Sequence, residues 1–168
     1  MMSTQPETSE EVPLILDNIG FLIGKTEHIK DRLLEKYLAY PALEEELTSS
    51  QAKVLFQIHK FQSYRPSDIG KMLNVDKSNI TRMVERLEKK DLIERHPDPD
   101  DRRSFLLYLT DKGRATVNRA MPLAVNALAE LEQALTDEEK AQLRHCLRKI
   151  VTAAIDEQCL AQLLKGTK

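Results

Sequence analysis

The sequence predicts a mainly α-helical fold in which a pair of short helices is followed by a β-hairpin. Three observations support this prediction. Apolar residues recur at helical spacing over most of the chain. Apolar and polar residues alternate near 103–109, and a cluster of Pro and Asp at 97–101 separates this run from a second strand-like run. A length of 168 residues is typical of one domain with a single core.

The segment from Asp76 to Lys90 has the clearest helical pattern in the chain. Asp76 is a good N-cap, and one buried stripe follows it at Ile80, Met83, Val84 and Leu87. The opposite face is polar and basic, with Lys77, Ser78, Asn79, Arg82 and Arg86. Such a face fits the major groove of DNA, because Arg can pair with guanine and Asn with adenine. The alternative is an ordinary exposed helix face, but two Arg residues at i and i+4 would repel each other without an external anion.

A shorter helix at 67–73, with Ser67 as its expected cap, precedes this one. About three residues separate the two, which is the spacing of a helix-turn-helix. After Leu92, residues 93–96 and 103–109 are predicted to be strands joined by the turn at 97–101. This hairpin, or wing, would present Asp101, Arg102 and Arg103 at its tip.

The run SDIGKMLNVDKSNITRMVERLEKKDLIERHPDPDDRRSFLLYLTDKG resembles the winged helix-turn-helix of the MarR family of bacterial transcriptional regulators. The match rests on the DKSNITRMVERLEKKDLIER run, the DDRR wing tip and the LTDKG that follows. The resemblance implies a homodimer that binds an inverted-repeat operator as a repressor or an activator and is controlled by a small amphipathic or phenolic ligand. Of the two roles we expect a repressor that the ligand releases, and the sequence leaves the choice open. It also implies that Asp101 holds Arg103 in place, that Arg103 enters the minor groove, and that Arg102 contacts phosphate.

The flanking segments are expected to form a helical dimerisation region. Residues 1–11 are polar and expected to be disordered, and 12–168 would form one domain. Within it, 12–40 and 111–165 are expected to be dimerisation helices, and 48–110 the DNA-binding lobe. The apolar stripe of the first helix is larger than one short neighbouring helix could cover, which favours burial by a partner chain.

Helix starts in these segments are predicted from capping residues. They are Thr8-x-x-Glu11 with Pro13, Thr48-x-x-Gln51, Thr110, and Thr136-x-x-Glu139. Pro122 predicts a kink or break near Ala120. In the last helix the residues expected to face inward are Leu143, Leu147, Ile150 and Ala154.

The resemblance also implies a ligand pocket where the first, second and fifth helices meet the DNA-binding lobe. Polar residues near this place are His28, Tyr37, Tyr40 and His59. No motif fixes the pocket, and each of these residues also fits an ordinary core or surface position. The acidic run Glu44–Glu46 is expected to be a solvated face without a function.

Several classes of protein are disfavoured by the sequence. It has no Gly-rich phosphate loop, no G-x-S-x-G and no recognisable pair of catalytic carboxylates, so we do not expect an enzyme. The four His residues do not pair at i,i+4 and there is no C-x-x-C, so neither a metal nor another cofactor is expected. The N-terminus lacks the pattern of a signal peptide, and no apolar run spans a bilayer, which favours the cytoplasm and no membrane contact.

Two rival functions remain open at this point. The net charge of −2 does not by itself indicate a nucleic-acid partner. The basic helix face could therefore bind an acidic protein in a winged-helix assembly module. A redox-responsive regulator could act through Cys146 or Cys159. A steep salt dependence of binding would indicate DNA, and loss of a redox response in Cys→Ser variants would indicate the redox regulator.

Overall fold

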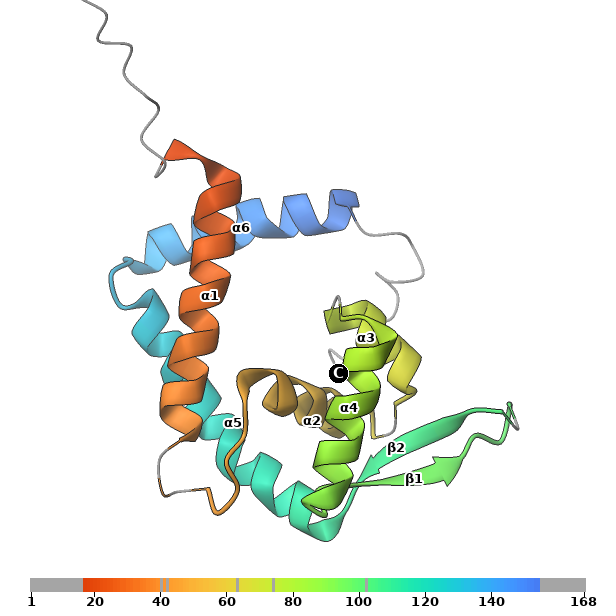
Figure 1. The fold of residues 1–168 in the computed structure, drawn as a ribbon. Helices are drawn as coiled ribbons and strands as arrows, with labels where there is room; N and C mark the ends of the chain where they lie inside the picture. Colours follow the sequence, from red (N-terminus) through yellow and green to blue (C-terminus); the bar gives the residue numbers. More distant parts are fainter. Residues whose placement is uncertain are drawn as a thin grey trace, which may run out of the picture.

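The computed structural model describes residues 17–39, 41, 43–62, 64–73, 75–101 and 103–154. Helices and strands follow one another in the predicted order (Figure 1). They are α1 (Ile19–Leu38), α2 (Ser49–Phe61), α3 (Pro66–Leu73), α4 (Lys77–Lys89), β1 (Ile93–Pro97), β2 (Phe105–Leu109), α5 (Asp111–Glu132) and α6 (Asp137–Ala154). The predicted fold class, a mainly helical chain with a winged helix-turn-helix, is confirmed.

Helix α1 begins later than the sequence suggested. We expected a start near Pro13, but Asn18 has an extended backbone (φ −86°, ψ 111°) and its side chain accepts a hydrogen bond from the Phe21 amide at 2.8 Å. Asn in this position is a strong N-cap, so the helix starts directly after it. The predicted start signals lie outside the described residues. Only Leu34 and Leu38 are buried along α1.

Helix α2 begins with the predicted capping box. The Thr48 hydroxyl accepts from the Gln51 amide at 3.2 Å, and the Gln51 side chain accepts from the Thr48 amide at 3.2 Å. Both donors would otherwise lack partners in the first turn. The buried side of α2 includes Val54, Leu55 and Ile58, which lie at the centre of the core.

Helices α3 and α4 form the helix-turn-helix. Helix α3 begins at Pro66, a favourable first helical residue because it has no amide to satisfy. Ser67 therefore lies inside the first turn, and our prediction that it caps the helix was wrong. Helix α4 begins after Asp76, as predicted, and buries Ile80, Val84 and Leu87.

The wing is a two-stranded antiparallel hairpin in which Ile93 lies opposite Leu109 and Pro97 opposite Phe105. Strand β2 starts two residues later than expected. The Ser104 amide donates to the Asp101 carbonyl at 2.9 Å, which extends the turn to this point. An isolated bridge between Tyr64 and Leu107 fastens the loop before α3 to β2.

Helix α5 is capped by Thr110, whose hydroxyl accepts from the Gly113 amide at 2.9 Å. We predicted a kink or a break near Ala120; the helix is continuous through Pro122, which excludes the break. The carbonyl that Pro122 leaves without an amide partner belongs to Asn118, which is exposed, so water can bond to it. Near the start of α5, a Cβ placed on Gly113 would lie 1.9 Å from the Leu92 carbonyl oxygen.

Unlike α5, helix α6 as described has no buried residue. It begins with the predicted capping box, in which the Glu139 amide donates to the Thr136 hydroxyl at 3.2 Å. None of the residues described for this helix is buried. Leu143, Leu147 and Ile150, which we expected to face inward, are 47%, 38% and 50% exposed. That expectation was wrong for a single chain.

The apolar core lies inside the lobe formed by α2, α3, α4 and the hairpin. It extends to Leu34 and Leu38 of α1 and to Val117 and Ala120 of α5. In Figure 1, α6 lies at the end of the molecule opposite the hairpin. No helix within the described ranges is long and apolar enough to cross a bilayer.

Candidate nucleic-acid interface

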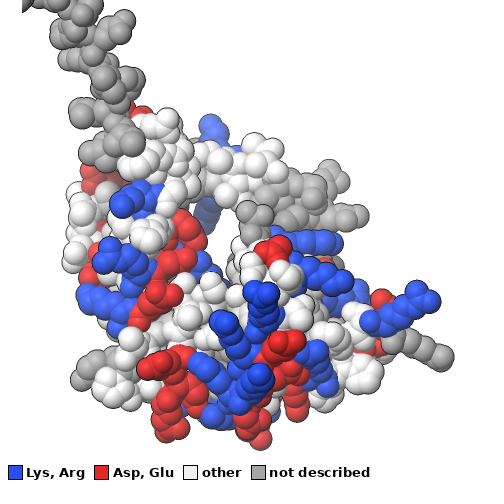
Figure 2. All heavy atoms as spheres, in the orientation of Figure 1, with Lys and Arg blue, Asp and Glu red and all other residues white. Residues whose placement is uncertain are grey.

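All five residues that the sequence singled out on α4 are exposed. Four of them fall within one side of the helix, opposite the buried stripe, because successive residues turn by about 100°. These four are Ser78, Asn79, Arg82 and Arg86, and Lys77 begins the helix beside them; all five are exposed. Lys and Arg side chains gather over α4 and the hairpin on the face seen in Figure 2, with acidic side chains between them.

The N-terminal turn of α4 is held by Asp76. Its Oδ1 accepts from the Asn79 amide at 3.0 Å. The Ser78 hydroxyl donates to the same oxygen at 2.6 Å, and the Asn79 side-chain nitrogen donates to Oδ2 at 2.5 Å. These hydrogen bonds, led by the one from Ser78, lower the pKa of the Asp76 carboxyl. Two of the predicted base-reading side chains are thus hydrogen-bonded to the cap.

The tip of the wing is ordered by Asp101. Its Oδ1 accepts from the backbone amide of Arg103 at 3.0 Å. We expected Asp101 to hold Arg103, and the contact that the structure gives is to the backbone. The Arg103 side chain is exposed. Arg102, the third residue predicted at the tip, lies outside the described residues.

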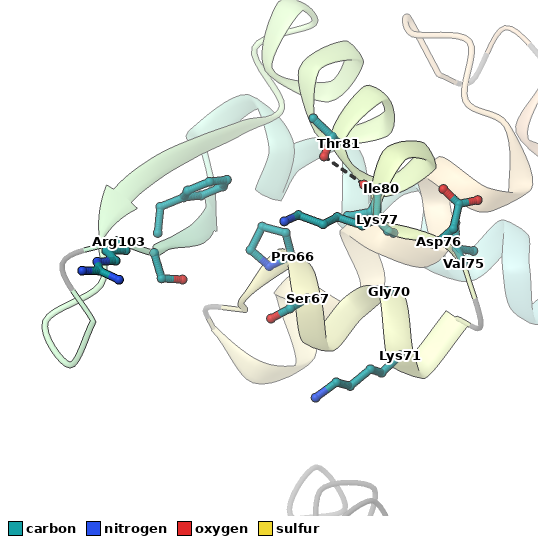
Figure 3. Close-up of a pocket in the computed structure, with 12 residues that line it drawn as sticks. Pro66, Ser67, Gly70, Lys71, Val75, Asp76, Lys77, Ile80, Thr81 and Arg103 are labelled. Atoms are coloured by element: carbon teal, nitrogen blue, oxygen red, sulfur yellow. Dashed lines mark hydrogen bonds between the residues drawn. The ribbon is translucent and has the colours of Figure 1, made fainter.

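A groove joins the two candidate surfaces. It has a volume of about 920 Å³ and lies between α3, the start of α4 and the wing (Figure 3). Lys71 of α3, Lys77 of α4 and Arg103 of the wing all line it. The first turn of α4 and the wing therefore present cations to one groove, whereas Arg82 and Arg86 do not line it. Lys71 was missed in the sequence because an isolated exposed Lys on a helix is an ordinary feature.

The turn of the wing contains an ion pair that the sequence did not indicate. Asp98 is only 3% exposed, and its carboxylate accepts from Arg65 Nε at 2.5 Å and from the Asp100 amide at 3.0 Å. Arg65 lowers the pKa of the Asp98 carboxyl. The negative charge of Asp98 is thereby neutralised inside the protein, so it does not oppose the approach of a phosphate to the wing.

We expect Asp98→Asn to remove a pH-dependent part of the stability. Because the folded-state pKa is lowered, the ion pair stabilises the chain above the unfolded pKa of about 3.9 and stops doing so as the pH falls through the folded value. The free energy of unfolding, measured in urea from about pH 3 to pH 7, should therefore be lower in the variant at pH 7. The difference from wild type should shrink at the acid end.

The control for this measurement is Asp100→Asn. The Asp100 side chain is 85% exposed and lies 3.8 Å from Arg65. Its replacement therefore removes the same charge from the same turn without breaking a buried ion pair. Equal pH profiles for the two variants would show that the Asp98 pair does not have this role.

Of the predicted ligand-binding residues, the structure describes His28, Tyr37 and His59. Tyr37 donates a hydrogen bond to Glu130 at 2.9 Å, and this contact raises the pKa of the Tyr37 hydroxyl. It lines a shallow groove with Asn126 and Glu130, and neither His28 nor His59 lines that groove. His28 is exposed on α1 and His59 is half-buried on α2. Tyr40 lies outside the described residues.

One of the two cysteines lies within the described residues. Cys146 is exposed on α6. Cys159 lies outside the described residues. Nothing in the described structure connects Cys146 to α4 or the hairpin.

Comparisons with known sequences point to one family. A sequence model of the MarR family matches residues 47–105. The "Multiple antibiotic resistance protein MarR" of Escherichia coli (strain K12) is 37% identical over 152 residues, which cover 90% of this chain and 99% of that protein. The "Transcriptional repressor MprA" of the same organism is 33% identical over 128 residues, or 74% of this chain and 72% of that protein.

Solved structures agree with the sequences. A mutant MarR from E. coli, crystallised in complex with operator DNA, superposes with a TM-score of 0.71 at 36% identity, over 82% of this chain and 97% of that chain. The apo form of wild-type MarR from E. coli superposes with a TM-score of 0.67 at 36% identity, over 79% of this chain and 96% of that chain. The likeness therefore extends beyond the helix-turn-helix to the flanking helices.

Proposed function

Since this chain belongs to the MarR family of transcriptional regulators, we propose that it represses transcription by binding an inverted-repeat operator as a homodimer. In this proposal it acts in the cytoplasm, and it works by binding rather than by catalysis. A small amphipathic or phenolic ligand releases it from DNA.

One observation carries the proposal. Lys77 in the first turn of α4 and the exposed Arg103 of the wing line one groove, which brings the start of the helix and the wing tip to the same side of the lobe (Figure 3). A helix in the major groove with a neighbouring ribbon over the minor groove needs this arrangement. Ser78 and Asn79 would read bases after exchanging their hydrogen bonds with Asp76 for bonds to the base edges.

The distribution of exposed apolar residues supports the homodimer. Within the described ranges, all of the exposed large apolar side chains lie on α1, α5 or α6, and none lies in the lobe. They are Ile19, Phe21, Leu22, Ile23 and Ile29 on α1; Met121, Val125 and Leu128 on α5; and Leu143, Leu147, Ile150 and Val151 on α6. Exposed apolar side chains concentrated on a few helices are typical of a protein interface. A second copy of the chain would cover it and carry a second α4.

The direct test is selection of bound duplexes from a random DNA library at two salt concentrations. We expect a palindromic site whose half-sites are centred about one helical turn, or roughly 34 Å, apart. Affinity for that site should fall steeply as salt rises, since each phosphate contact releases a counterion. Recovery of no motif, with only weak binding that moderate salt removes, would favour the assembly-module alternative.

Arg103→Ala should weaken binding to the selected operator by about 1–3 kcal/mol while the dimer stays intact. The reason is that the variant removes the exposed cation at the wing tip without touching the hairpin backbone, which Asp101 orders. Binding is measured by fluorescence anisotropy at constant salt, and the dimer by light scattering.

The matched control is Arg32→Ala, which removes an exposed Arg from α1 instead. It should bind as wild type does. If the Arg103 variant also keeps wild-type affinity, the wing does not contact DNA in the way proposed.

A further inference from the structure

The acidic run between α1 and α2 is not the uniform solvated face that the sequence suggested. Glu44 is exposed, with 77% of its side chain accessible, whereas the Glu45 side chain is 8% accessible. Burial of a carboxylate is unfavourable unless hydrogen bonds and opposite charges compensate it. Glu45 must therefore have such partners, and the structure identifies them.

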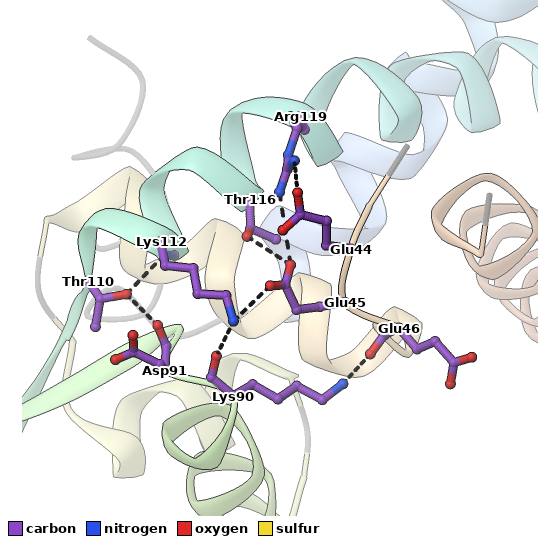
Figure 4. Close-up of polar contacts among 10 residues, drawn as sticks. Glu44, Glu45, Glu46, Lys90, Asp91, Thr110, Lys112, Thr116 and Arg119 are labelled. Atoms are coloured by element: carbon purple, nitrogen blue, oxygen red, sulfur yellow. Dashed lines mark hydrogen bonds and ion pairs between the residues drawn. The ribbon is translucent and has the colours of Figure 1, made fainter. Parts of the chain in front are cut away.

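The partners of Glu45 lie along one side of α5 (Figure 4). Lys112 Nζ lies 2.8 Å from Glu45 Oε1, and the Thr116 hydroxyl donates to Oε2 at 3.3 Å. Arg119 reaches the same carboxylate at 4.0 Å. Residues 112, 116 and 119 are spaced i, i+4, i+7, so they form one stripe on the helix. The hydrogen bond from Lys112 lowers the pKa of Glu45, which keeps its charge.

The same cluster holds the C-terminal end of α4. Lys112 Nζ also donates to the Lys90 carbonyl at 2.9 Å, and Lys90 is the C-cap of α4. The Lys90 side chain in turn donates to the Glu46 carbonyl oxygen. The end of α4, the start of α5 and the segment before α2 are therefore joined at one point (Figure 4).

This point lies between the two functional parts of the molecule. Helix α5 carries part of the exposed apolar surface and enters the lobe directly after β2. The segment 39–48 is the other covalent connection, since it leads from α1 into α2. An ion pair that fixes these two connections to each other and to α4 would also fix the direction of α4 relative to the dimerisation helices.

We propose that Glu45, through Lys112, is a positioning residue that sets the separation of the two α4 helices in the dimer and hence the half-site spacing of the operator. The proposal rests on the function proposed above. It makes the acidic run a determinant of DNA specificity, although none of its residues reaches DNA.

The alternative is that the cluster only stabilises the fold. Other contacts already join α1 to α2: the Ser49 amide donates to Glu35 at 3.1 Å, and Lys53 pairs with Asp31 at 2.7 Å. The lobe should therefore remain folded and attached without Glu45. If Glu45 only stabilises the fold, its replacement should lower the affinity for every operator by the same factor. If Glu45 positions α4, its replacement should change the preference among operator spacings.

The experiment measures binding of the full chain to a series of operators that differ only in the number of base pairs between half-sites. For wild type, we expect a change of one base pair from the best spacing to weaken binding about tenfold, since a well-defined separation of two reading helices is required. For Glu45→Gln we expect that preference to fall to less than about threefold or to move to another spacing.

Three further variants sharpen the test. Glu46→Gln makes the same charge change in the same segment, but Glu46 contributes its backbone oxygen to the cluster, so its profile should match wild type. Lys112→Met should resemble Glu45→Gln, and the double variant should be no worse than either single variant, because both act through one contact. Lys112→Arg, which keeps the charge, should restore much of the preference. Thermal unfolding and light scattering show that each variant is folded and dimeric.

The outcomes are distinguishable. Identical spacing profiles for wild type and Glu45→Gln would overturn the positioning role and leave the proposed function intact. A uniform loss of affinity at all spacings would overturn it in favour of simple stabilisation. If wild type bound no operator of any spacing, the proposed function would fail and this inference with it.

Discussion

Replacing Leu147 and Ile150 of α6 together with Glu should leave the chain monomeric and lower its affinity for the operator by at least about 100-fold. Both side chains are exposed in the single chain, at 38% and 50%, and they lie on the same side of the helix. In the proposed dimer they are buried, so two new charges per chain would face each other or the apolar surface of the partner. A monomer has only one α4 and can occupy only one half-site.

The fold of the lobe should survive this change, because α6 as described contributes no buried residue. Light scattering measures the mass, circular dichroism the helix content, and anisotropy the operator affinity. The control is Ala141→Glu, which places a charge on the opposite, exposed face of the same helix. A doubly substituted chain that stays dimeric and binds normally would show that α6 is not part of the interface.

Gly113→Ala should destabilise the chain by about 3 kcal/mol or more. The added Cβ would lie 1.9 Å from the Leu92 oxygen and 2.9 Å from its carbonyl carbon, so backbone must move on one side of the contact. Leu92 is fully buried, and its carbonyl also accepts from the Thr110 amide at 3.2 Å. Movement there would disturb both the junction of α5 with the wing and the core beneath it.

The matched control is Gly24→Ala in α1, where nothing lies within 4 Å of the added methyl group. That variant should be neutral or up to about 1 kcal/mol more stable, because Ala favours a helix over Gly. Urea unfolding followed by circular dichroism measures both variants. Equal stabilities would mean that the approach of Gly113 to Leu92 is looser than the structure indicates.

Features set by neighbouring residues could be predicted from the sequence. The caps at Thr48, Asp76, Thr110 and Thr136 each involve residues three positions apart, so the pattern that predicts them is the contact itself. The exposed face of α4 was predictable for a similar reason, because helical geometry places it opposite the buried stripe. These local features account for the element order, for most helix starts and for the candidate DNA-binding face.

Features set by distant residues could not be predicted in this way. Arg65 and Asp98 are 33 residues apart, and nothing in either segment indicates that one neutralises the other. Glu45 is likewise far from Lys112, so the acidic run looked solvated. The apolar stripe of α6 was recognised, but a stripe does not indicate whether its own chain or a second chain covers it. The turning of Ser78 and Asn79 toward Asp76 depends on rotamers that the sequence leaves open.

The lack of buried residues on α6 has a consequence for how the gene product would respond to its own abundance. At low expression, the number of dimers formed by association of two chains rises with the square of the chain concentration. Operator occupancy would then rise more steeply than the amount of protein made, and halving the chain concentration would lower the number of dimers about fourfold. A chain whose α6 is covered only by a second copy thus gains a steeper response to its own concentration without any additional binding site.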